Sequence, residues 1–222
     1  MQKLYNHLKK EYGDTITNLS ATSENNQFII NDGVLVSLDK LKKDYQNNKD
    51  YEFTSSDALF IKKHENGNFQ IYFFEFKKLD PTSKEDWGMS KTRLQKCINK
   101  MKNCKNGCEF IEELKRCETK LVDKYHLSLR SKPFDSMSLM YHVIMNFYPD
   151  MKDYECKKLL LKCDKYFYII SKTSQEWSST PKNKSNRRKI TGILSILDRL
   201  KPYYYNEVFS VSENGFNDFF IN

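Results

Sequence analysis

An almost unbroken apolar run at residues 69–76, FQIYFFEF, constrains the fold of this chain more than any other segment. Its apolar and aromatic composition predicts a central β-strand that is covered on both faces. Because side chains alternate along a strand, Glu75 and Lys77 share one face with Ile71 and Phe73. A carboxylate and an ammonium group are costly to bury unless they are paired, hydrated or bound to a metal ion. The end of this strand is therefore the first place to look for a functional site.

The segment before this run predicts a partner strand. Residues 57–63, DALFIKK, are typical of a strand that begins at an acidic residue, and the polar residues 65–68 supply a turn into a second strand at 69–77. Two other Glu-x-Lys triplets, at 113–115 and 118–120, lie where charges recur at helical spacing. We expect those two on the solvated face of an amphipathic helix. The third Glu-x-Lys triplet, at 75–77, differs from them because it ends an apolar strand and follows a strand that begins with an acidic residue.

An acidic residue at the start of one strand, followed by Glu-x-Lys on the next, resembles the PD-(D/E)xK nuclease superfamily. The resemblance rests on Asp57 and on the triplet 75–77, and Ser56 stands where the pattern of the family has a proline. It implies an α/β fold with a restriction-endonuclease-like core, in which helices flank a central mixed β-sheet. We expect a single domain over residues 1–222, with a helical elaboration at about 85–150 after the two motif strands.

The resemblance also implies a Mg²⁺-dependent phosphodiester hydrolase in which Mn²⁺ can substitute. Asp57 and Glu75 are the expected metal ligands, together with the backbone carbonyl of Phe76. Mg²⁺ prefers one or two carboxylates plus waters and substrate phosphate oxygens. Lys77 is expected to orient or help deprotonate the attacking water and to stabilise charge in the transition state. Glu11, in the predicted N-terminal helix, is either a further metal ligand or an ordinary surface glutamate.

The charge of the chain suits a polyanionic partner. The net charge is +8, and residues 182–189, KNKSNRRK, carry five basic side chains and no acid. The candidate nucleic-acid-binding residues are Lys78, Lys182, Lys184, Arg187, Arg188 and Lys189. We expect DNA rather than RNA as the substrate, cut by an endonuclease of restriction, repair or mobile-element type. An enzyme that cuts both strands would act as a homodimer on a palindrome.

Several other classes of protein are disfavoured by what the sequence lacks. It has no run long enough for a membrane-spanning helix and no apolar signal-peptide core, so we expect a cytoplasmic protein. Its glycines show neither a GxGxxG nor a P-loop spacing. His126 and His142 belong to no ligand pattern, and Arg130 and Lys132 are phosphate-contact candidates from charge and position alone.

The cysteines leave two alternatives open. Four of them, Cys97, Cys104, Cys108 and Cys117, lie close enough in sequence to suggest a structural metal, but their spacing matches no Cys-x2-Cys zinc pattern. The other alternative is reduced thiols partly buried along helices.

Hydrophobic periodicity predicts the remaining elements. They are an N-terminal helix, a hairpin or strand–turn–strand at 27–38 with its turn at 31–33, and a short helix or helical turn at 38–48. Helices are expected at about 89–103, 108–126 and 135–147, followed by a strand at 165–171 beside the 69–77 strand, a helix at 187–200 and an edge strand at 207–212.

Two other functions compete with the nuclease hypothesis. One is a nucleic-acid-binding protein on a nuclease-like fold that does no chemistry. The other is an interaction protein whose motif is accidental, in which the carboxylates of Asp57 and Glu75 would lie far apart.

Overall fold

The computed structural model describes residues 1–21, 29–46, 54–77, 129, 131–171, 177–178, 197, 199–201 and 203–221. These residues form an α/β fold around one mixed sheet of seven strands, in the order β1-β2-β3-β4-β5-β7-β6. The strands are β1 (Gly13–Thr15), β2 (Val34–Ser37), β3 (Ala58–Lys63), β4 (Phe69–Lys77), β5 (Asp164–Ser171), β6 (Trp177–Ser178) and β7 (Glu207–Ser212).

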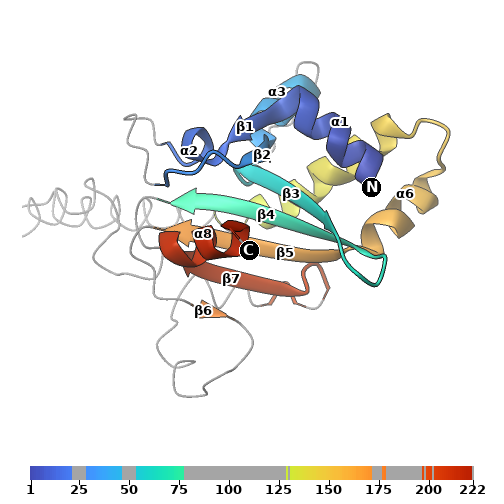
Figure 1. The fold of residues 1–222 in the computed structure, drawn as a ribbon. Helices are drawn as coiled ribbons and strands as arrows, with labels where there is room; N and C mark the ends of the chain where they lie inside the picture. Colours follow the sequence, from blue (N-terminus) through green and yellow to red (C-terminus); the bar gives the residue numbers. More distant parts are fainter. Residues whose placement is uncertain are drawn as a thin grey trace, which may run out of the picture.

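Strand β4 lies at the centre of this sheet, and its two edges are paired differently. It pairs antiparallel with β3, where Ala58 faces Phe74, and parallel with β5, where Lys77 faces Ser171. The strands from β1 to β4 alternate in direction, whereas β4, β5 and β7 run the same way. Glu75 and Lys77 therefore lie at the end of the sheet where these three parallel strands finish (Figure 1).

Helices cover both faces of the sheet. One face carries α1 (Gln2–Tyr12), α3 (Leu38–Gln46), a helix at 131–147 and α6 (Asp153–Leu161). The other carries α2 (Ile16–Leu19) and α8 (Glu213–Ile221). In Figure 1, α8 lies in front of the sheet and the yellow 131–147 helix lies behind it. Each layer has its own apolar core, because the buried side chains form two separate clusters.

The alternation predicted for β4 is confirmed. Ile71 and Phe73 belong to the cluster under the 131–147 helix, and Tyr72, Phe74 and Phe76 belong to the cluster under α8. The predicted turn between β3 and β4 is also confirmed, and Gly67 has the positive φ, 86°, that glycine adopts without steric strain. Glu75, two residues beyond Phe73, consequently points toward the 131–147 helix.

Several other elements agree with the sequence-based expectations. The N-terminal helix, the helix that follows Ser37, and strand β5 beside β4 are all present. The helix expected at 135–147 begins earlier, with helical residues at 129 and from 131 to 147. Its residues Leu139, Met140, Val143 and Ile144 are buried, and Phe147 is half-buried against the same core.

The hairpin or strand–turn–strand expected at 27–38 is wrong: among its described residues, 29–38, only Val34–Ser37 forms a strand, and this strand pairs with β1. Residues before it wrap around α2, where the Thr17 N–H donates to the Asn31 carbonyl and the Thr17 hydroxyl accepts from the Asn31 N–H. Those backbone groups are thereby used by α2 rather than by a neighbouring strand.

The C-terminal half also departs from expectation in two places. Strand β7 is not the edge of the sheet, because β6 pairs with it at Phe209 and Ser210. Helix α6 was not predicted, because the consecutive leucines at 159–161 show no helical spacing. In the structure its buried side chains, Cys156 and Leu160, are one helical turn apart.

The predicted helices at 89–103 and 108–126, and most of the one at 187–200, lie outside the described residues. Among the helices that the structure describes, none has the length and apolar character needed to cross a membrane.

Candidate active site

Asp57 lies directly before β3 and is held against the end of β4. Its backbone N–H donates to the Phe74 carbonyl at 2.9 Å, and its Oδ2 accepts from the Phe76 N–H at 2.6 Å. The second bond is a charge-assisted hydrogen bond to a carboxylate, which is stronger than a neutral one. The side chain of Asp57 remains 22% exposed. The hairpin thus fixes the first acidic residue of the motif beside the second.

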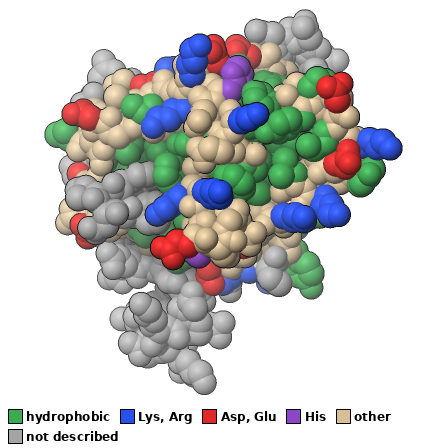
Figure 2. All heavy atoms as spheres, turned by 45° about the vertical axis from the view of Figure 1, so that its right-hand side comes forward, with side chains coloured by type: hydrophobic (Ala, Val, Ile, Leu, Met, Phe, Trp, Pro, Cys, Tyr) green, Lys and Arg blue, Asp and Glu red, His purple; other side chains and the backbone are tan. Residues whose placement is uncertain are grey.

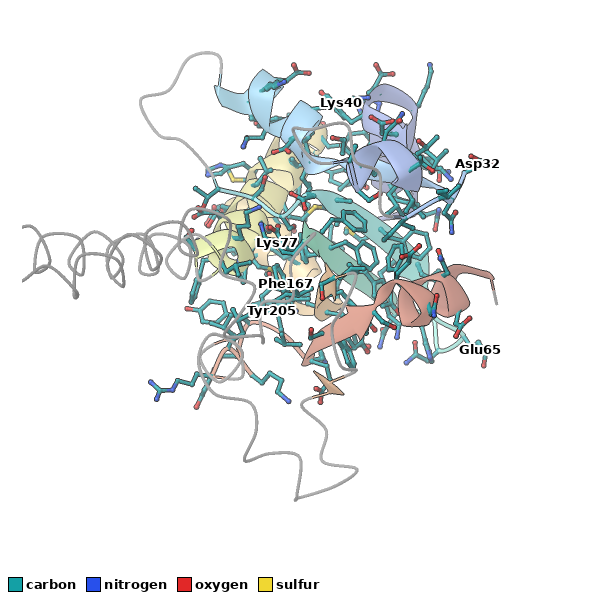
Figure 3. All side chains as sticks on the ribbon, turned by 90° about the vertical axis from the view of Figure 1, so that its left-hand side faces the viewer. Asp32, Lys40, Glu65, Lys77, Phe167 and Tyr205 are labelled. Atoms are coloured by element: carbon teal, nitrogen blue, oxygen red, sulfur yellow. The ribbon has the colours of Figure 1, made fainter. Side chains whose placement is uncertain are left out.

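Glu75 is fully buried, with 0% of its side chain exposed, and is paired with Lys77. The Lys77 Nζ lies 2.5 Å from the Glu75 Oε1, and the two side chains project from the same face of β4. Figure 3 views the end of the molecule at which β4 finishes, and Lys77 lies near the centre of that view. The Lys77 side chain is 23% exposed, so its ammonium group lies at the boundary between the core and solvent.

Lys132, near the start of the 131–147 helix, is a second ammonium group on Glu75. Its Nζ lies 2.7 Å from both Glu75 carboxylate oxygens and 3.5 Å from the Asp57 Oδ1. From the sequence, Lys132 was only a phosphate-contact candidate, because the residues around it do not indicate which strand its helix crosses. Asp57 and Glu75 are therefore brought together around one ammonium group, contrary to what an accidental motif would require.

Burial and the nearby Glu75 carboxylate raise the pKa of Asp57 to about 7, against the opposing influence of Lys132, Lys77 and the Phe76 N–H. Burial disfavours the ionised form of a carboxyl group, and a second carboxylate adds repulsion. A carboxyl group whose pKa is raised by burial and by a second carboxylate is a frequent feature of functional sites.

The Phe76 backbone is oriented toward the same place. Its N–H donates to Asp57, and in an extended strand the N–H and the C=O of one residue point to the same edge. The Phe76 carbonyl therefore faces the edge of β4 on which Asp57 lies, while the Phe76 ring packs edge-on against Phe216 on the other face of the sheet.

Serine and threonine side chains fasten the segment before β3 to the 131–147 helix. The Ser56 N–H donates to the Ser136 Oγ at 2.9 Å, and both serines are fully buried. The Thr54 N–H donates to the Asp135 Oδ2 at 2.9 Å. Proline has no N–H and could not make the first of these bonds. Ser56 thus connects the segment of Asp57 to the helix of Lys132.

A pocket of about 290 Å³ is lined by Asp57 and Phe76, and Asp14 and Asp39 are also among its lining residues. Asp14 pairs with Lys40 at 2.8 Å. Glu11 is exposed on α1. Within the described part of the chain, no three His, Cys, Asp or Glu side chains are grouped to hold a metal ion, so Glu11 does not join Asp57 and Glu75 in such a group.

A larger cavity of about 700 Å³, between the end of the 131–147 helix and α6, is lined by none of the predicted site residues. Cys156 and Cys163 are buried free thiols. The cysteines at 97–117 lie outside the described residues.

The candidate nucleic-acid-binding residues Lys78, Lys182, Lys184, Arg187, Arg188 and Lys189 lie outside the described residues, as does Arg130. Lys132, the other phosphate-contact candidate, is described and lies on Glu75. On the face in Figure 2, blue Lys and Arg side chains are scattered among red acidic ones and do not form a continuous patch. That face therefore supplies no concentrated basic surface from the described residues.

Comparison with known proteins identifies no relative: no family model matches the chain, and neither the curated proteins nor the solved structures contain a match.

The raised pKa of Asp57 makes a testable prediction for stability. Its folded pKa, about 7, is above the ordinary value of 3.8, so the favourable contribution of the protonated form is complete below about pH 4 and is lost as pH rises through 7. We expect Asp57→Asn to stabilise the fold at pH 8 by about 1 kcal/mol or more, which for a chain of this size raises the Tm by about 2–4 °C or more. The rise in Tm should be smaller at pH 5. Differential scanning calorimetry at the two pH values measures this.

Asp14→Asn is the matched control, with the opposite sign. Although desolvation raises the pKa of Asp14, hydrogen bonds from Lys40, Asn18 and Thr15 lower it overall. Its contribution is present at neutral pH and is lost as pH falls through the folded pKa. Asp14→Asn should therefore lower the Tm at pH 8. A lower Tm for Asp57→Asn at pH 8 would contradict the account of Asp57.

The contact between Ser56 and Ser136 gives a second prediction. Ser136→Ala leaves the buried Ser56 N–H without its acceptor, which should lower the free energy of unfolding by about 1–3 kcal/mol. Ser55 is equally buried, but its Oγ has no hydrogen-bond partner, so Ser55→Ala should change stability little or increase it. Urea unfolding of both variants measures the difference, and equal losses would contradict the contact.

Proposed function

We propose that this protein is a metal-dependent nuclease with a restriction-endonuclease-like core, most consistent with a DNA endonuclease. One observation carries the proposal: the carboxylates of Asp57 and Glu75, from neighbouring strands, share a single ammonium group while Lys77 lies on the same carboxylate. This is the arrangement that the Asp…Glu-x-Lys pattern requires. It supports the resemblance stated from the sequence, in which Asp57 precedes one strand and Glu75 and Lys77 end the next.

The residues present fit a hard divalent cation such as Mg²⁺, with Mn²⁺ as a substitute. The donors would be the carboxylates of Asp57 and Glu75 and the Phe76 carbonyl, all of them oxygen ligands. The two carboxylates approach one positively charged group, the Lys132 Nζ, at 2.7 Å from Glu75 and 3.5 Å from Asp57, which supports their use by a cation. Two carboxylates suffice, since Mg²⁺ usually keeps several waters and binds substrate phosphates.

The bound cation would supply Lewis acidity toward the phosphate and lower the pKa of a bound water. The protein residues would do the rest. Glu75 holds the Lys77 ammonium at the end of β4, where the partly exposed Nζ can donate to an attacking water or to a phosphate oxygen. A positive group fixed where negative charge develops stabilises the transition state without further reorganisation.

A second candidate is a nucleic-acid-binding protein that does no chemistry. It is favoured by the absence of a third metal-binding carboxylate among the described residues and by the pairing of both acids with lysine. Tight DNA binding in EDTA, with no cleavage by any divalent metal, would support this alternative. For the nuclease, the partner is DNA, and a homodimer is expected if both strands are cut.

The nuclease predicts that Glu75→Gln and Lys77→Met each reduce cleavage by about 100-fold or more, because each removes a group that acts on the reacting centre. The assay uses supercoiled plasmid and single-stranded DNA, with Mg²⁺, Mn²⁺ or EDTA. Glu207→Gln is the control, since Glu207 also pairs with a lysine, Lys201, at 3.0 Å but lies at the opposite end of the parallel strands.

Cleavage that persists in both site variants would exclude this assignment of the active site. Loss of cleavage in Glu207→Gln as well would indicate that disruption of any half-buried ion pair impairs the fold, and the circular dichroism spectrum of each variant separates the two effects.

A further inference from the structure

The position of Lys132 differs from that of an ordinary ion-pair partner. Its Nζ is equidistant, at 2.7 Å, from the two Glu75 oxygens and is also 3.5 Å from the Asp57 Oδ1. Lys77, by comparison, approaches Glu75 at Oε1 from within the same strand. Lys132 reaches across from another layer of the fold to the point where the two carboxylates converge. It is 15% exposed, so its charge is largely removed from water.

A single positive charge that two carboxylates share is what a divalent cation would provide at this place. A cation bound to the same oxygens, at the roughly 2.0–2.6 Å typical of hard cations, would lie within a few ångström of the Lys132 Nζ. Two positive charges at such a distance repel each other strongly in a partly desolvated site. The ammonium group of Lys132 and the cation therefore exclude each other from this position.

We propose that Lys132 is a built-in counterion of this centre: its ammonium group occupies the cation position in the metal-free protein and is displaced when a divalent cation binds. The inference rests on the proposed function, because it assumes that Asp57 and Glu75 bind a metal. Lys132 keeps the two carboxylates together without the metal, and its removal leaves them mutually repelling and more receptive to a cation. It is a positioning residue of the site.

The displacement requires only a movement of the side chain. The helix that carries Lys132 is fastened to the segment before β3 by the Ser56–Ser136 and Thr54–Asp135 hydrogen bonds. The long lysine side chain can turn away from Glu75 while its backbone stays in place. Glu75 keeps Lys77 as a partner during the exchange, so its buried carboxylate never lacks a positive charge.

The test measures Mn²⁺ affinity, not cleavage, by isothermal titration calorimetry and by the rise in Tm with Mn²⁺ concentration. We expect Lys132→Met to bind Mn²⁺ at least about tenfold more tightly than the wild type, because the competing charge is gone. Lys132→Arg keeps a positive charge on Glu75 and should bind Mn²⁺ no more tightly than the wild type. Lys201→Met, which removes a similarly buried lysine from the Glu207 ion pair, should leave the affinity unchanged.

Each outcome decides the matter. Unchanged or weaker Mn²⁺ binding by Lys132→Met, with measurable binding by the wild type, overturns the role of Lys132 and leaves the nuclease proposal standing. Failure of both proteins to bind Mn²⁺ overturns both. If Lys132→Met is unfolded without metal, Mn²⁺ should restore its fold by replacing the lost charge, and failure to restore it overturns the inference.

Discussion

The burial of the Glu75 carboxylate is the constraint on which the site depends. Glu75 is inaccessible to solvent near the end of the central strand, where a carboxylate is stable only if positive charge comes to it. Lys77 supplies one charge from the same strand, and Lys132 supplies another from the helix that packs over it. An apolar residue would fill this position at less cost, since its neighbour on β5 is Ile169. The carboxylate is therefore better explained by function than by stability.

The second organising interaction is the fastening of the 131–147 helix to the segment before β3. Because Ser56 donates its N–H to Ser136, the strand of Asp57 and the helix of Lys132 are held in one relation to each other. The two carboxyl groups then meet the two ammonium groups in a small space that is only partly open to water. Burial, with the repulsion of Glu75, raises the pKa of Asp57 to about 7 despite the two ammonium groups and the Phe76 N–H.

Local patterns predicted the hairpin and its faces because β-strand alternation is set by neighbours in sequence. Ile71 and Phe73 could be separated from Tyr72 and Phe74 on this ground alone. Lys132 could not be placed from the sequence. It is 57 residues from Glu75, and its distance to Glu75 depends on how its helix crosses the sheet, which no short-range pattern encodes. Strand β1, which carries Asp14, was not predicted for a different reason: its three residues are too few to show a period.

The most direct test of the account is a crystal structure of the protein soaked in Mn²⁺, with diffraction data collected at the manganese absorption edge. The account predicts an anomalous peak between the carboxylates of Asp57 and Glu75, about 2.0–2.6 Å from oxygens of both, with the Lys132 ammonium group displaced from Glu75. A structure in which manganese is bound elsewhere, or not at all, with Lys132 still on both Glu75 oxygens, would contradict it.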